Sequence, residues 1–155
     1  MRKRKPKQRI ITPDPRFGDV MVTKFVNNMM LEGKKSTNFA NFYDAMDIIQ
    51  EKTGENPHEV WKKALNMAMP AVEVRSKRIG GATFQIPTEI YASRKISNGM
   101  KWLIRFARAR SGKSMAEKLA AELMAAAKGE GAAVKKKEDT HRMAEANRAF
   151  AHFKA

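Results

Sequence analysis

Apolar side chains recur at helical spacing through most of this chain, and this period is the strongest constraint on its fold. Val22, Phe25, Val26 and Met29 fall at i, i+3, i+4 and i+7, which places them on one side of a helix starting at about Asp19. Five more stretches share the period, and they lie at about 39–54, 57–69, 93–110, 115–128 and from 133 onward. The sequence therefore predicts a mainly α domain of six helices spanning about 17–155.

Two capping signals support these helix starts. Asn56 precedes Pro57 in "NPHE", and Ser114 opens "SMAE", so each supplies a side-chain acceptor with a glutamate three residues later. For the helix at about 93–110, the spacing predicts Trp102 either in the core or stacked on a base. For the last helix it predicts an inward face made of Val134, Met143, Ala146 and Phe150.

One stretch breaks the helical period and predicts a β-hairpin at about 72–90. In "VEVRSKRIGGATFQIPTEI" apolar residues alternate, and Gly80-Gly81 supplies the positive φ angles of a tight reversal. Since an isolated two-stranded hairpin is marginal in water, its base needs a brace. We expect Val72, Val74, Ile86 and Ile90 to supply it. The outer end then forms a protruding basic arm about 25 Å long; a packed hairpin with solvated charges is the alternative.

The charge balance indicates a polyanionic partner. Lys and Arg number 31 against 16 Asp and Glu, giving a net charge of +15 and a pI near 10.3. Nucleic acid is the leading partner and an anionic membrane a distant second. Residues 1–16 form a basic tail and an extended connector, and we expect the tail to be disordered until it binds phosphate; a solubilising tail is the alternative.

Several other classes of protein lack support. The chain has no cysteine, no apolar run of the ~20 residues that cross a membrane, and no signal peptide, so a cytoplasmic protein without a membrane partner is expected. "SGKS" at 111–114 fails as a P-loop because Ala107 stands where glycine is required. His58, His141 and His152 lack metal-ligand spacing. We therefore predict no catalytic residue, metal, cofactor or small-molecule substrate.

Three blocks of sequence resemble a known family. "GKKS" after the first helix, "PAVEVRSKRIGGATFQIPTEI" and "AVKKKEDTHRMAEANRAFAH" are similar, in order and spacing, to bacterial small-subunit ribosomal protein seven. The resemblance covers about 8–153 and implies a helical domain with a β-arm. It implies binding to the 3′ major (head) domain of 16S rRNA, early head assembly, a place beside the exit-site tRNA, and contacts with neighbouring small-subunit proteins of the head and platform.

The resemblance also implies which residues meet RNA. The rRNA-binding set would be Arg2, Lys3, Arg4, Lys5, Lys7, Arg9, Lys34, Lys35, Arg75, Lys77, Arg78, Arg94, Lys95, Lys101, Arg105, Arg108, Lys113, Lys135, Lys136 and Lys137. The set near tRNA would be Ile79, Gly80, Gly81, Ala82, Thr83, Phe84 and Arg142. Residues 90–93, "IYAS", replace a more basic stretch of the family, so less RNA contact is expected there. An architectural DNA-binding protein with a β-arm remains the alternative, and an enzyme acting on nucleic acid is disfavoured.

Overall fold

The computed structural model describes residues 9–153, so the predictions for Arg2, Lys3, Arg4, Lys5 and Lys7 lie outside the described residues. The described part is mainly helical with one two-stranded antiparallel hairpin, as predicted. Its elements, in order, are α1 (Val20–Met29), α2 (Lys35–Thr53), α3 (Pro57–Ala68), β1 (Val72–Ile79), β2 (Ala82–Glu89), α4 (Ala92–Ala109), α5 (Met115–Lys128), α6 (Ala132–Ala146) and a 3-10 helix η1 (Arg148–Phe153).

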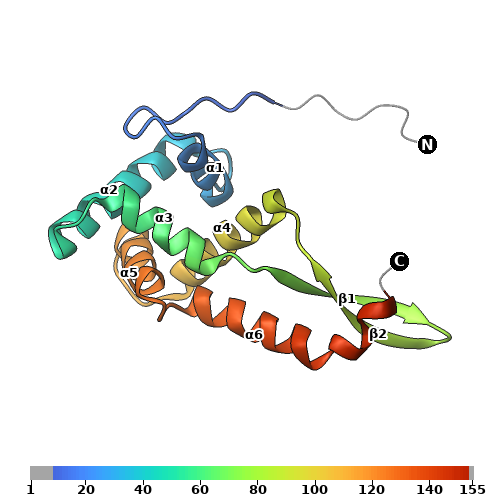
Figure 1. The fold of residues 1–155 in the computed structure, drawn as a ribbon. Helices are drawn as coiled ribbons and strands as arrows, with labels where there is room; N and C mark the ends of the chain where they lie inside the picture. Colours follow the sequence, from blue (N-terminus) through green and yellow to red (C-terminus); the bar gives the residue numbers. More distant parts are fainter. Residues whose placement is uncertain (1–8, 154–155) are drawn as a thin grey trace.

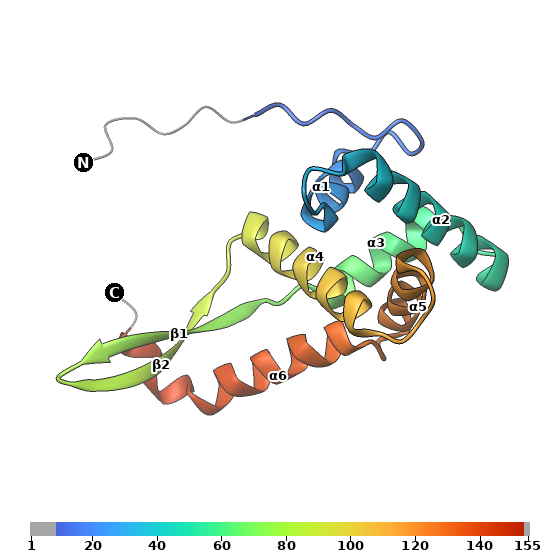
Figure 2. The ribbon, with the colours of Figure 1, turned by 180° about the vertical axis from the view of Figure 1, so that it is seen from behind.

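Helices α1 to α5 gather at one end of the molecule, and the hairpin projects from them (Figures 1 and 2). Helix α6 runs from this group of helices along the hairpin, where it contacts both strands. The chain then turns back at η1, which packs against β2. The arm is therefore accompanied by the C-terminal part of the chain up to η1, and its tip extends beyond η1 (Figures 1 and 2).

Side-chain and glycine caps define the helix ends. Asp19 accepts a hydrogen bond from the backbone of α1, Asn56 does so for α3, and Ser114 does so for α5. The last two confirm the predicted caps. Helices α2 and α5 end at Gly54 and Gly129, whose φ angles of 69° and 85° are left-handed and favour glycine.

The core lies among α1 to α5 and is centred on three aromatic rings. Phe25, Phe42 and Trp61 are completely buried, and their ring centroids lie 5.6 to 6.0 Å apart in tilted or edge-on arrangements. Such arrangements suit the quadrupoles of aromatic rings. Helix α5 contacts α2, α3, α4 and α6, so its buried Leu119 and Leu123 form the middle of the packing.

The hairpin closes through the predicted glycine pair. Ile79 pairs with Ala82, so only Gly80 and Gly81 form the loop. Their φ angles are 56° and 90°, as a type I′ turn requires, and an added Cβ at either would meet nothing within 4 Å. The glycines are thus required by backbone conformation and not by crowding.

The predicted brace at the base of the hairpin is only partly correct. Ile86 and Ile90 are buried, but Val72 and Val74 are half-buried. Arg75 is the cross-strand partner of Ile86, so Ile86 lies on the face opposite to the two valines. The hairpin is therefore supported on both faces and not through one apolar face.

The predicted inward face of α6 is wrong at its C-terminal half. Met143 is 46% exposed and Ala146 is exposed. Met143 stands nine residues after Val134, and at 100° per residue this is half a turn away from it. The side that packs inward consists of Ala133, Val134, Thr140 and Ala144.

Candidate nucleic-acid interface

A row of cations on α4 faces away from the core. Met100, Leu103 and Ala107 are buried. The cations Lys101, Arg105 and Arg108 follow at i, i+4 and i+7 on an exposed side of the same helix. With part of α1 they line a surface groove whose residues are Asn28, Lys101, Ile104, Arg105, Arg108 and Ala109. The structure thus brings together three of the predicted rRNA-binding residues. Trp102, which lies between them in sequence, is half-buried against the core.

One of these cations also has a structural contact. Arg108 donates from Nη2 to the carbonyl oxygen of Met29 at 2.7 Å, at the end of α1. A cation at a helix C-terminus satisfies a carbonyl that has no partner within the helix. Lys101 and Arg105 are exposed.

Two further predicted cations share one carboxylate at the base of the arm. Glu73 accepts from Arg75 Nε at 2.6 Å and from Arg94 Nε at 2.8 Å, which links β1 to the first turn of α4. Burial acts to raise the pKa of Glu73, but the hydrogen bonds from Arg94 and Arg75 outweigh it and lower that pKa. The Glu73 side chain is 13% exposed, whereas the two guanidinium side chains are more than half exposed. The cations are therefore held in place with donors still facing solvent.

The outer half of the arm is supported by η1. Phe84 packs against Phe150 and Phe153, with ring centroids 5.3 and 5.5 Å apart, and Lys77 Nζ donates to the carbonyl oxygen of Phe153 at 3.3 Å. Phe84 was expected at an open tip, but it is half-buried within this aromatic cluster. Of the set expected near tRNA, the exposed members on the arm are Gly80, Gly81, Ala82 and Thr83, and Ile79 is half-buried.

The remaining predicted cations are distributed over the surface. Arg9, Arg78, Lys113 and Lys135 are exposed, and Lys95, Lys136 and Lys137 are half-buried. Lys34 pairs with Glu32 at 2.8 Å, and Lys35 lies 5.8 Å from the ring centroid of Phe39. Arg142 on α6 has an 80% exposed side chain and lies 4.0 Å from Asp139.

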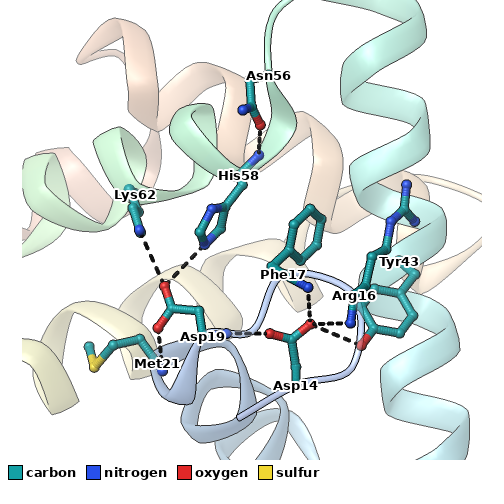
Figure 3. Close-up of polar contacts among 9 residues, drawn as sticks. All are labelled: Asp14, Arg16, Phe17, Asp19, Met21, Tyr43, Asn56, His58 and Lys62. Atoms are coloured by element: carbon teal, nitrogen blue, oxygen red, sulfur yellow. Dashed lines mark hydrogen bonds and ion pairs between the residues drawn. The ribbon is translucent and has the colours of Figure 1, made fainter.

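A polar network that the sequence did not reveal fixes the segment before α1. Asp14 is 2% exposed, and its carboxylate accepts hydrogen bonds from the backbone N–H groups of Arg16, Phe17 and Asp19 and from the hydroxyl of Tyr43 (Figure 3). Aspartate favours such local bonds to the backbone in turns. Asp14 in "PDPRFG" was the available signal.

Asp19 extends this network to α3. Its Oδ2 atom lies 3.0 Å from His58 Nε2 and 3.3 Å from Lys62 Nζ (Figure 3). Desolvation acts to raise the pKa of Asp19, but hydrogen bonds from Met21, His58 and Lys62 lower it overall. Phe17 stacks on the His58 ring at 4.9 Å between centroids. The chain that precedes α1 is thereby fastened to α2 and α3.

Neither a metal cluster nor a membrane-spanning helix is found among the described residues. Between residues 9 and 153, no three His, Cys, Asp or Glu side chains are grouped as a metal ion would need. In the same range every helix is too short or too polar to cross a bilayer. The exposed cations of α4 and of the β-hairpin arm favour an anionic ligand.

Taken together, a helical domain with a cationic helix face and a basic hairpin arm defines a nucleic-acid-binding class of protein. The chain belongs to the ribosomal protein S7p/S5e family, whose model matches residues 1–148. Among similar proteins are those of Cytophaga hutchinsonii, 61% identical over 154 residues, and Flavobacterium johnsoniae, 62% identical over 157 residues. A protein of Bacteroides fragilis is 58% identical over 157 residues. Each pair is covered over 99% of both chains, and each relative is named small ribosomal subunit protein uS7.

Proposed function

We propose that this chain is a structural component of the small ribosomal subunit, in the cytoplasm, where it binds rRNA and neighbouring ribosomal proteins. The observation that carries the proposal is the 61% identity to a small ribosomal subunit protein uS7 over 99% of both chains. The net charge of +15 supports it, since a compact domain gains nothing from such self-repulsion without a polyanionic partner.

The cations on α4 supply the physical basis for binding. Lys101 and Arg105 stand one helical turn apart on an exposed face, with Arg108 one turn further. Cations in such a row neutralise successive phosphates and release counterions, so the affinity falls with salt. Because the major groove of A-form RNA is too narrow for side chains to enter, this face recognises backbone shape and junctions.

The finer assignment extends the family resemblance. In this proposal the chain binds the 3′ major domain of 16S rRNA, nucleates assembly of the head, and lies beside the exit-site tRNA with neighbouring proteins of the head and platform. A projecting arm with an exposed loop at Gly80 to Thr83 supports a contact with a second RNA. Phe84 then contributes by holding this loop in place through η1. The role is structural, and no reaction is assigned to the chain.

Filter binding to RNA of the 3′ major domain, over a series of salt concentrations, tests the proposal. We expect the double variant Lys101→Ala/Arg105→Ala to weaken binding and to reduce the slope of log K against log salt by about 1 to 2. The control is Lys52→Ala/Lys63→Ala, which removes the same charge from exposed positions of α2 and α3. We expect this control to bind nearly as tightly as the wild type.

Duplex DNA of equal length, at the same salt, separates the two nucleic-acid hypotheses. Preference for the rRNA supports the ribosomal role. Equal or tighter binding to the DNA would instead favour an architectural DNA-binding protein. An equal loss in both double variants would show that overall charge, and not the α4 face, determines binding.

A further inference from the structure

Tyr91 is a large aromatic side chain that faces solvent at the junction of the arm and the helical domain. It is 84% exposed and lies between the end of β2 at Glu89 and the start of α4 at Ala92. Its neighbour Ile90 is 5% exposed and donates its N–H to the carbonyl oxygen of Ala71 at 3.3 Å. The buried Ile90 side chain therefore fixes the connection between β2 and α4, whereas the Tyr91 ring faces solvent.

The backbone of Tyr91 is fixed. Its carbonyl oxygen accepts hydrogen bonds from the N–H groups of Arg94 at 2.9 Å and Lys95 at 3.0 Å, as the residue that precedes the first turn of α4. A tyrosine side chain has only two rotatable χ angles, so little further freedom is lost when something covers the ring. The position thus presents a flat apolar surface at low entropic cost.

Oriented cations follow Tyr91 closely in the sequence and lie on the neighbouring strand β1. Arg94, three residues further on, and Arg75 on β1 are both held by Glu73, while their side chains remain 53% and 58% exposed. Lys95 follows Arg94, and Glu89 adds an opposing charge. Because carboxylates partly balance the cations, the exposed ring is the distinctive feature of this region. Tyr91 is exposed and its carbonyl oxygen bonds to the Arg94 N–H, so this junction offers a flat ring for a base and held guanidinium groups for phosphates.

We propose that Tyr91 stacks on an unpaired base of RNA, and that Arg94 and Arg75 bind the adjoining phosphates. The inference rests on the proposed ribosomal function and adds a contact at residues 90–93, where the loss of basic residues predicted less RNA contact. Stacking accepts any base, because every base has a flat face. The contact therefore selects an unpaired nucleotide and not a particular sequence.

The test compares Tyr91→Ala, Tyr91→Leu and Tyr91→Phe in binding to RNA of the 3′ major domain at fixed salt. We expect the first two variants to bind about five- to fiftyfold more weakly, and the phenylalanine variant to stay within about twofold of the wild type. The salt slope should not change in any of them because no charge is removed, whereas Arg94→Ala should reduce it by about 1. Since Tyr91 is exposed, all three variants should unfold at the wild-type urea concentration.

A second measurement identifies the contact directly. RNA carrying 5-iodouridine in its unpaired segments should cross-link to Tyr91 under long-wavelength ultraviolet light, and mass spectrometry should find the modified peptide. A cross-link supports the inference, whereas wild-type affinity in Tyr91→Ala would overturn it. So would unchanged RNA affinity combined with weaker incorporation into the subunit, which would identify a protein as the partner of the ring. A wild-type chain that prefers duplex DNA would overturn the ribosomal proposal and this inference together.

Discussion

Arg110 donates from Nε to Oε2 of Glu122 at 2.6 Å, and this glutamate side chain is completely buried. Its other oxygen, Oε1, accepts the backbone N–H of Ala133 at 3.0 Å. One carboxylate on α5 therefore connects the end of α4 with the first turn of α6. A buried carboxylate is stable only when paired in this way, so the position of α6 depends on it.

The variant Glu122→Gln should lower the free energy of unfolding by about 1–3 kcal/mol, because the amide cannot balance the Arg110 charge. Urea denaturation followed by circular dichroism measures this. The control is Asp139→Asn, which breaks an exposed pair with Arg142 at 4.0 Å and should change stability by less than about 0.5 kcal/mol. Equal stability of both variants would show that the buried pair has no net stabilising effect.

Removing the Phe84 ring should loosen the arm and leave the helical domain intact. Phe84→Ala should lower the free energy of opening of η1 by about 1 kcal/mol, through loss of the contacts with Phe150 and Phe153. Hydrogen exchange measured by mass spectrometry should speed up in 82–86 and 148–153. Exchange in α5 should not change, and Thr83→Ala, at an exposed neighbouring position, should leave all segments as in the wild type. Slow exchange of η1 in Phe84→Ala would contradict the bracing role.

His141 should make the attachment of the arm depend on pH. Its Nε2 accepts the N–H of Ala71 at 3.0 Å, where the chain enters β1. Burial, with a smaller effect of Lys137, lowers the pKa of His141 below its ordinary value. The unfolded chain then binds the proton more tightly. The bond between Ala71 and neutral His141 therefore stabilises the folded arm above pH ~6.5, the ordinary pKa of histidine. This stabilisation is lost as the pH falls through the lower pKa of His141 in the folded chain.

Urea midpoints at several pH values test this. The stability of the wild type relative to His141→Gln should fall on acidification, because glutamine keeps an acceptor that does not titrate in this range. His152→Gln, at an exposed position, should parallel the wild type. Identical pH profiles for the wild type and His141→Gln would rule out the titration of His141 as the cause.

The glycines of the arm loop should be required for the turn alone. Gly80→Asn should preserve the hairpin, because asparagine followed by glycine suits a type I′ turn. Gly81→Val should destabilise it by about 1–2 kcal/mol, since φ is 90° there and valine is β-branched. Cross-strand nuclear Overhauser effects between Ile79 and Ala82 report the turn. We expect rRNA affinity within about twofold in Gly80→Asn; a tenfold loss with the turn intact would show RNA against the loop backbone.

Local sequence signals predicted most of the fold. The helices, the caps at Asn56 and Ser114 and the glycine turn each depend on residues close together in the chain. The cationic face of α4 could also be predicted from the sequence, because its buried Met100 and exposed Lys101 follow one helical period. Periodicity is informative where a helix is amphipathic over several turns.

What the sequence did not predict depends on contacts between distant residues. The inward face of α6 packs partly through Thr140 and half-buried His141, so apolar spacing alone selected Met143 wrongly. The packing of Phe84 on η1 joins residues more than sixty positions apart. The Asp14–Tyr43 bond likewise joins a turn to another helix. Only the folded chain brings such partners together.

The support of the hairpin by α6 and η1 has a consequence for the order of folding during synthesis. Residues 72–90 leave the synthesising ribosome before residues 132–153, which they need as a support. At a synthesis rate of about 5–20 residues per second, the hairpin remains without this support for several seconds. An isolated hairpin is marginal in water over that time. The arm therefore takes its final form only after residues 132–153 have been synthesised.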